Sequence, residues 1–209
     1  MNKYTSLIVV AAFATSCSSS LAPLRKDGLK PTVVTETVLH DTDDPAIWIH
    51  PTNPQESLVI GTDKDTDGGL YVFNLQGKII KKSETIKRPN NVDIAYGLQI
   101  DGVLTDIAVT TERETNKIRI FSLPDLKPLD NGGIPVFEGE LERDPMGIAI
   151  YTRPSDKAVF AIVGRKSGPS GSYLWQYELK GTSNAKVEAT LMRKFGAYSG
   201  KKEIEAIAV

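Results

Sequence analysis

Two adjacent carboxylates open one of the apolar segments of the chain, in the run Asp43-Asp44-Pro45. Because a proline restricts the preceding residue to extended backbone, Pro45 holds Asp44 at the start of a strand rather than in a helix. Neighbouring carboxylates repel each other unless a cation neutralises them. Calcium takes about six to eight oxygen ligands, carboxylates and carbonyls among them. The acidic pair is therefore a candidate cation site.

Oxygen-bearing side chains stand at the corresponding place in later segments. Asn90 and Asn91 precede a similar apolar run that contains Asp93, and Glu203 and Glu205 open the last one. If these segments meet around one axis, their oxygen atoms converge on one point. The alternative is turn and capping chemistry, which favours Asp and Asn without any metal.

Three cationic residues form a second set: Lys64, Arg113 and Lys166. Each follows an equivalent apolar strand, so a repeat architecture would bring them to the same end as the carboxylates. Lysine and arginine beside a metal-binding cluster suit a ligand with several phosphates. The alternative is that they are ordinary solvated loop charges.

The elements that would position these residues are repeats. One pattern appears as DDPAIWIHP at 43–51, NNVDIAYG at 90–97, DPMGIAIYT at 144–152 and EIEAIAV at 203–209, which we align on Ile47, Ile94, Ile148 and Ile207. A second pattern follows in step, as LVIGT at 58–62, DIAVTT at 106–111 and FAIVGR at 160–165. Repeats of about 40–50 residues with four short strands are typical of β-propeller blades. The sequence predicts an all-β fold of about three four-stranded blades, ending inside the first strand of another.

Composition and missing motifs exclude several classes of function. With a net charge of −1 over 209 residues, the chain has no global field that would attract nucleic acid, so no nucleic-acid partner is expected. The chain contains no G-x-S-x-G, no H-E-x-x-H and no G-x-x-x-x-G-K-[ST] motif. A covalent serine mechanism and nucleotide hydrolysis are therefore unsupported.

The N-terminus has the pattern of a processing signal. Lys3 precedes a short apolar run at 7–14, and small residues lead into Cys17, the only cysteine. The apolar run is too short to span a bilayer, which takes about 20 residues. We predict a lipoprotein-type signal peptide at 1–17 with Cys17 as the acylated N-terminus, a flexible tether at 18–31 and the propeller domain at 32–209. The protein is then exported and membrane-anchored only through its lipid, on the periplasmic or cell-surface side; the alternative is an ordinary secretory signal.

Several separated motifs together resemble the β-propeller phytase family, the bacterial 3-phytases. They are DDPAIWIHP, the GTDK loop with GGLYVF, RPNNVDIAYG, GRK and EIEAIAV, and the resemblance runs from about Val33 to Val209. It implies a propeller of about six blades and about twice this length, of which this chain would be the N-terminal half. It also implies calcium ions at the top of the central channel.

The resemblance also implies roles for individual residues. By position, the metal ligands would be Asp41, Asp43, Asp44, Asn91 and Glu205. The phosphate-binding and catalytic residues would be Lys64, Arg113 and Lys166, with Glu205 joining the catalytic set. Asp65 and Met146 depart from the pattern, because well-studied members have lysine and commonly tyrosine there.

The leading functional hypothesis is calcium-dependent hydrolysis of phosphate monoesters of inositol hexakisphosphate (phytate), bound as a calcium complex. The resemblance places further ligands in later blades, so activity of this chain alone stays open, and self-association could complete the ring. The rivals are a non-catalytic, lipid-anchored binding module and an inactive fragment. A calcium lactonase fits less well, because its site does not need three phosphate-binding cations.

Overall fold

The computed structural model describes residues 27–209. The predicted signal peptide with Cys17, and most of the predicted tether, lie outside the described residues. Val33–Val209 forms one compact unit. Residues 27–32 belong to the preceding unit and contain no helix or strand. In the described part of the chain, no helix is long and apolar enough to cross a membrane.

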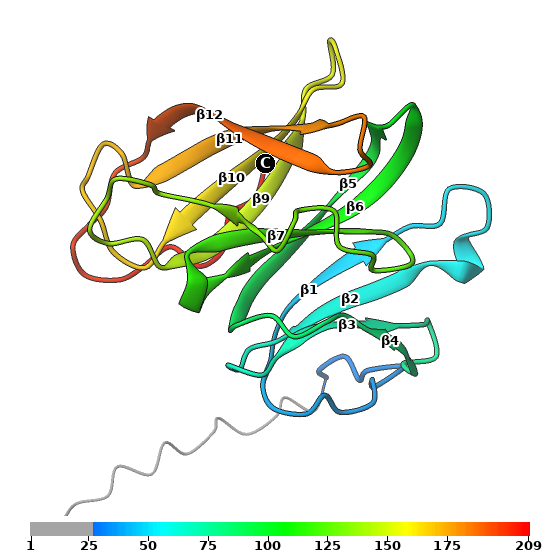
Figure 1. The fold of residues 1–209 in the computed structure, drawn as a ribbon. Coiled ribbons are helices and arrows are strands. Elements are labelled where there is room, and N and C mark those ends of the chain that lie inside the picture. Colours follow the sequence, from blue (N-terminus) through cyan, green and yellow to red (C-terminus); the bar gives the residue numbers. More distant parts are fainter. Residues whose placement is uncertain (1–26) are drawn as a thin grey trace, which may run out of the picture. The chain divides into compact units, whose positions relative to one another are not determined.

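The described residues form three four-stranded antiparallel sheets, here called blades 1, 2 and 3 (Figure 1). Blade 1 comprises β1 (Thr42–Trp48), β2 (Leu58–Asp63), β3 (Gly69–Phe73) and β4 (Ile79–Lys82). Blade 2 comprises β5 (Pro89–Ile100), β6 (Val103–Glu112), β7 (Lys117–Ser122) and β8 (Ile134–Pro135). Blade 3 comprises β9 (Pro145–Thr152), β10 (Val159–Arg165), β11 (Leu174–Gly181) and β12 (Val187–Phe195). Two short 3-10 helices, η1 (Pro54–Glu56) and η2 (Arg113–Thr115), lie in the connections.

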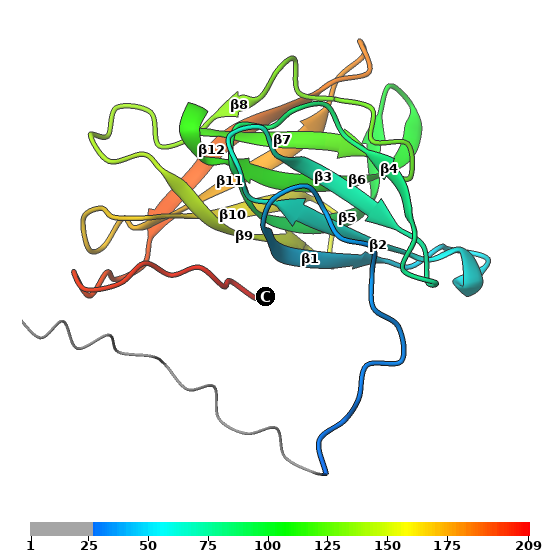
Figure 2. The same cartoon turned by 90° about the horizontal axis from the view of Figure 1, so that it is seen from below.

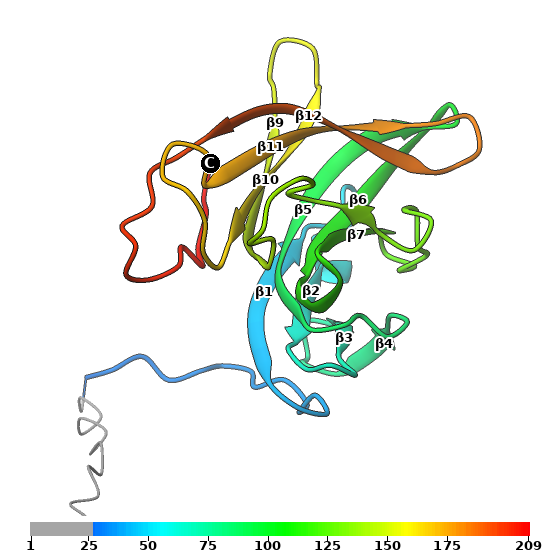
Figure 3. The same ribbon diagram turned by 60° about the vertical axis from the view of Figure 1, so that its left-hand side comes forward.

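The sheet topology confirms the predicted fold class. In every blade the strands pair in sequence order, so each blade is a simple meander whose first strand is an edge. Adjacent blades contact each other mainly through these first strands, β1 against β5 and β5 against β9. The three sheets are consistent with part of a propeller, and they do not close a ring within residues 27–209 (Figure 3).

The hydrophobic core consists of layers between neighbouring blades. Trp48, Ile60 and Val72 of blade 1 pack in one cluster with Ala108 and Phe121 of blade 2. A second, larger cluster joins the other face of blade 2 to blade 3, and it includes Ile107, Ile120, Ile148, Val163 and Trp175. Because both faces of blade 2 are covered, β6 is buried from Ile107 to Glu112 and β7 from Ile118 to Phe121.

The prediction that 203–209 begins another inner strand is wrong for the described structure, because this segment forms no strand. The inner strands β1, β5 and β9 each pair with the strand that follows in sequence, and no described strand follows this segment. It nevertheless lies against blade 3. The Ile204 N–H donates to the Tyr173 hydroxyl at 3.1 Å, and a Cβ at Gly147 would lie 2.3 Å from the Glu205 carbonyl oxygen. Figure 2 shows the segment, in red, passing below β9.

A buried arginine connects blade 2 to the end of blade 1. The Arg119 side chain, on β7, is 4% exposed, and its Nε donates to Asp130 at 2.8 Å. Its guanidinium also pairs with Glu84, in the connection between β4 and β5, and lies 3.9 Å from the Glu112 carboxylate. Charges taken out of water are tolerated only when they are paired in this way.

Replacing Arg119 with methionine should therefore destabilise the fold strongly. The R119M change keeps much of the apolar length of the side chain but leaves Asp130, which is fully buried, without its cation. We expect a loss of about 3–5 kcal/mol in the free energy of unfolding, measured by urea denaturation. The control is R153M, which breaks an exposed pair with Asp156 and should leave the midpoint unchanged. Equal midpoints for the two variants would contradict the assignment.

Candidate functional site

The same β-bulge recurs at the head of every inner strand. Three residue steps in the inner strand oppose two in its neighbour, between Thr42 and Pro45 in β1, between Pro89 and Val92 in β5, and between Pro145 and Ile148 in β9. A bulge leaves its extra residue unpaired and redirects side chains, which makes it suited to a binding site. The residues that these bulges present are Asp43-Asp44, Asn90-Asn91 and Met146-Gly147. We call this end of the blades the mouth.

This register corrects one part of the sequence alignment. Counted from the bulges, the second strands β2, β6 and β10 have equivalent residues at Val59, Ala108 and Ala161. Val59 pairs with Ile47, Ala108 with Ile94 and Ala161 with Ile150. Ile150, and not Ile148, is thus the third member of the set. A shift of two residues keeps every side chain on its own face, so the alternating pattern cannot distinguish the two alignments. As a consequence, blade 3 has Met146 and Gly147 where the other blades have carboxylates or amides.

One repeated backbone bond places the three cations at the mouth. The N–H of Lys64 donates to the Asp41 carbonyl at 2.7 Å, and the N–H of Lys166 donates to the Asp144 carbonyl at 2.8 Å. In blade 2 the N–H of Arg113 donates to the Arg88 carbonyl at 3.1 Å. The structure therefore brings Lys64, Arg113 and Lys166 to equivalent positions beside the heads of the inner strands.

The mouth side of blade 1 is acidic. Lys64 Nζ lies 2.6 Å from Asp43 Oδ1 and 4.0 Å from Asp41 Oδ2, so one lysine offsets only part of the charge of the two carboxylates. Asp63, which is fully buried, holds this loop in place by accepting the backbone N–H groups of His40 and Asp41 at 3.0 and 2.9 Å. His40 also contacts Asp63 through its ring, with 2.9 Å between Nδ1 and Oδ2.

Asp44 is the carboxylate that joins blade 1 to blade 2. Its Oδ2 accepts the N–H of Val92 at 3.0 Å, on the free edge of β5. Asp93 makes a similar bond one blade further on and two residues further along the strand, accepting the N–H of Ile150 at 2.7 Å. Burial raises the pKa of the Asp44 carboxyl, and the nearby carboxylates of Asp43 and Asp93 add to this effect. The site therefore holds more negative charge than its own hydrogen bonds compensate.

A cavity of about 300 Å³ lies among the inner strands, between these carboxylates and the C-terminal segment. Its lining includes Asp44, Asn91, Asp93, Ile148 and Ala206. Asp44, Asn91 and Asp93 thus face one space, whereas Glu205 is exposed and does not line it. Gly164 is equivalent to Thr62 and Thr111, and a Cβ at Gly164 would lie 3.5 Å from the Ile204 carbonyl oxygen. Glu205, the next residue, therefore lies beside blade 3 at about the level that Asp44 and Asn91 occupy in their blades.

Two features of this site fit a cation. The first is the raised pKa of Asp44. The second is the Asn90 Oδ1 atom, which is buried and has no hydrogen-bond donor among the described residues. Within residues 27–209, no three His, Cys, Asp or Glu side chains are grouped to hold a metal ion. A cation here would therefore need amide and carbonyl oxygens in addition to carboxylates, as calcium accepts.

Sequence reasoning missed the threonines that hold the mouth together. The Thr62 hydroxyl, on β2, donates to the Asn90 carbonyl of the next blade at 3.1 Å. The Thr111 hydroxyl, on β6, donates to the Met146 carbonyl at 2.9 Å. In each case the acceptor is the first residue of a bulge, whose carbonyl the sheet leaves unpaired. The signal was present, because each threonine stands two residues before a cation of the repeated set.

Comparison with known proteins places the chain in a family. The model of the Phytase family matches residues 3–207, so this chain belongs to that family. The chain is similar to the 3-phytase of Bacillus subtilis (strain 168), with 31% identity over 159 residues. That alignment covers 73% of this chain and 39% of the Bacillus protein, so the chain spans about two fifths of the length of the curated relative it matches.

The raised pKa of Asp44 generates a test of the geometry. A carboxyl whose pKa is raised above its ordinary 3.8 stabilises the fold in its protonated form below that value, and this contribution is lost as the pH rises through the raised pKa. Asp44→Asn removes the charge, while its amide oxygen can still accept the Val92 N–H. In calcium-free buffer, thermal unfolding should show D44N gaining stability relative to the wild type as the pH rises above the ordinary pKa of 3.8 and through the raised pKa. A stability difference that does not change with pH would contradict this.

Proposed function

We propose that the mouth binds inositol hexakisphosphate as a calcium complex and hydrolyses its phosphate monoesters. The observation that carries the proposal is the juxtaposition of a carboxylate cluster with excess negative charge and three cations at equivalent blade positions. Membership of the Phytase family and similarity to a 3-phytase support the substrate class.

Asp43, Asp44 and Asn91 would hold calcium, with Asp41 and Glu205 at the edge of the site. When bound, calcium supplies positive charge that neutralises phosphate oxygens and activates water for attack on phosphorus. Because Lys64 pairs with Asp43 and contacts Asp41, the lysine would leave these carboxylates when a cation binds and would then face the substrate.

Lys64, Arg113 and Lys166 would bind and orient the phosphates. Phosphoryl transfer depends mainly on positioning and on stabilisation of charge, so residues of this kind can supply much of the catalysis. Arg113 and Lys166 form no ion pair with a carboxylate in the part of the chain that the structure describes, and both side chains are at least partly exposed. Export through the predicted lipoprotein signal, with acylation at Cys17, forms part of the same proposal.

Phosphate release from inositol hexakisphosphate tests the activity. Purified protein should release inorganic phosphate when calcium is present, as measured by a malachite green assay. Phosphate release should stop when EDTA removes the calcium. The control is the same titration with D44N, which should need a higher calcium concentration because one carboxylate ligand is lost. Release at the rate of buffer alone would rule out hydrolysis by this chain.

Calorimetry separates catalysis from simple binding. Calcium-dependent binding of inositol hexakisphosphate without phosphate release would support the non-catalytic binding module. A melting transition that does not respond to calcium, together with no binding, would indicate an inactive fragment.

A further inference from the structure

The residue before each inner strand has the same backbone role but not the same charge. Asp41 in blade 1 and Asp144 in blade 3 accept the N–H of the following cation through their carbonyls. Arg88 has this role in blade 2, where it accepts the N–H of Arg113 at 3.1 Å. Blade 2 therefore places an arginine where the other two blades place an acid.

Backbone contacts hold Arg88 firmly at the mouth. Its own N–H donates to the Asp65 carbonyl at 2.9 Å, so the residue lies between the loop that follows Lys64 and the start of η2. Its φ of 61° falls in the left-handed region, which a residue with a Cβ adopts only when its surroundings require it. The position of Arg88 is thus determined by both neighbouring loops.

The charge of Arg88 is not compensated by the nearby acids. Neither Arg88 nor Arg113 forms an ion pair within residues 27–209. The carboxylates around them have other partners, with Glu112 accepting the Lys87 N–H, Glu114 the Thr66 hydroxyl and Asp67 the Lys87 ammonium. The two arginines are joined through their backbones, so an anion that reaches both side chains would be held by two positive charges.

We propose that Arg88 is a further substrate-binding residue, which forms with Arg113 a clamp for two neighbouring phosphate groups. The mouth then has two parts: the oxygen atoms of Asp43, Asp44 and Asn91 for the cation, and the two arginines of blade 2 for the anion. Guanidinium groups bind phosphate oxygens in a bidentate manner, which a lysine cannot do. This proposal rests on the proposed function.

Binding of inositol hexakisphosphate by isothermal titration calorimetry, in saturating calcium, tests the clamp. R88Q should weaken binding about tenfold or more, because hydrogen bonds between charged groups are lost. R88K should recover part of this loss. Thermal unfolding should be the same for all three proteins, since Gln and Lys meet the same backbone requirement as Arg.

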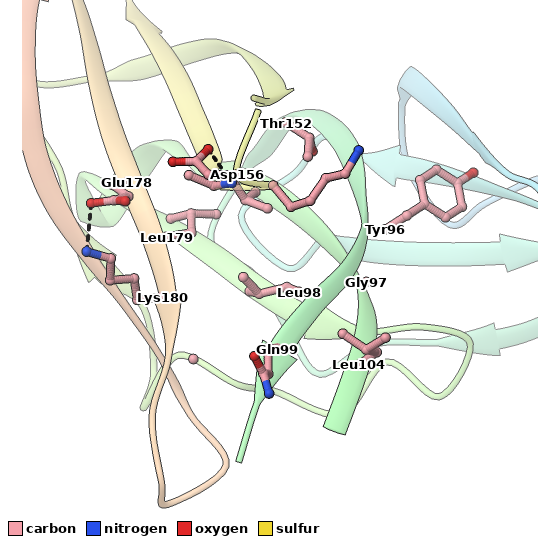
Figure 4. A pocket seen from close by; sticks show the side chains of 14 residues that line it. Tyr96, Gly97, Leu98, Gln99, Leu104, Thr152, Asp156, Glu178, Leu179 and Lys180 are labelled. Atoms are coloured by element: carbon pink, nitrogen blue, oxygen red, sulfur yellow. Dashed lines mark hydrogen bonds and ion pairs between the residues drawn. The ribbon is translucent and has the colours of Figure 1, made fainter. Parts of the chain in front are cut away.

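A matched control is available at the opposite end of blade 3. Lys157 is exposed, has a φ of 62° and forms no ion pair among the described residues. It lines a cavity of about 710 Å³ between blades 2 and 3, shown in Figure 4. Charged groups there are already paired, Glu178 with Lys180 at 2.9 Å and Asp156 with Arg153 at 2.6 Å. K157Q should therefore bind inositol hexakisphosphate as the wild type does.

The outcomes separate the two proposals. If the wild type binds and R88Q binds equally well, the clamp is wrong and the proposed function stands. If the wild type does not bind inositol hexakisphosphate with calcium, both are overturned. A loss in R88Q that also appears in K157Q would show a general charge effect and would likewise overturn the clamp.

Discussion

The structure depends on one repeated constraint, the extra residue that each inner strand carries at its head. The bulge breaks the pairing of β1, β5 and β9 with their neighbours at equivalent places, and it leaves a carbonyl and two side chains without partners in the sheet. Thr62 and Thr111 supply the missing hydrogen bonds from the preceding blade. The hydrogen bond from each threonine hydroxyl to a bulge carbonyl therefore also fixes one blade against the next.

Carboxylates perform a related task on the free edge of the inner strands. The N–H groups of Val92 and Ile150 have no strand to pair with, and Asp44 and Asp93 accept them. Buried N–H groups need such partners, so these acids would be useful to the fold even without a ligand. These acids place negative charge in a partly buried position. Burial there raises the pKa of Asp44 and makes a bound cation favourable. The acids that complete the fold are thus the same side chains that make a cation favourable at this place.

The mouth is uneven in charge, and this follows from differences between otherwise equivalent positions. Blade 1 presents Asp41 and Asp43, and Lys64 offsets part of their negative charge. Blade 2 presents two amides with Arg88 and Arg113, and blade 3 presents Gly147, where the close approach of the C-terminal segment leaves no room for a side chain. A symmetrical scaffold therefore produces a mouth whose charge differs from blade to blade.

The sequence alone was sufficient for the repeats, the four-stranded blades and the common end at which the cations and carboxylates lie, because alternation of apolar residues and turn residues is local. It was not sufficient for register, since Ile148 and Ile150 lie on the same face and a shift of two residues leaves the pattern unchanged. It also could not show that 203–209 stays outside a sheet, because strand formation depends on a partner. Only the tertiary structure decided that Arg88 shares the position of Asp41, that Asp63 is buried beneath the loop and that threonines join the blades, because these relations are contacts between segments that are distant in the chain.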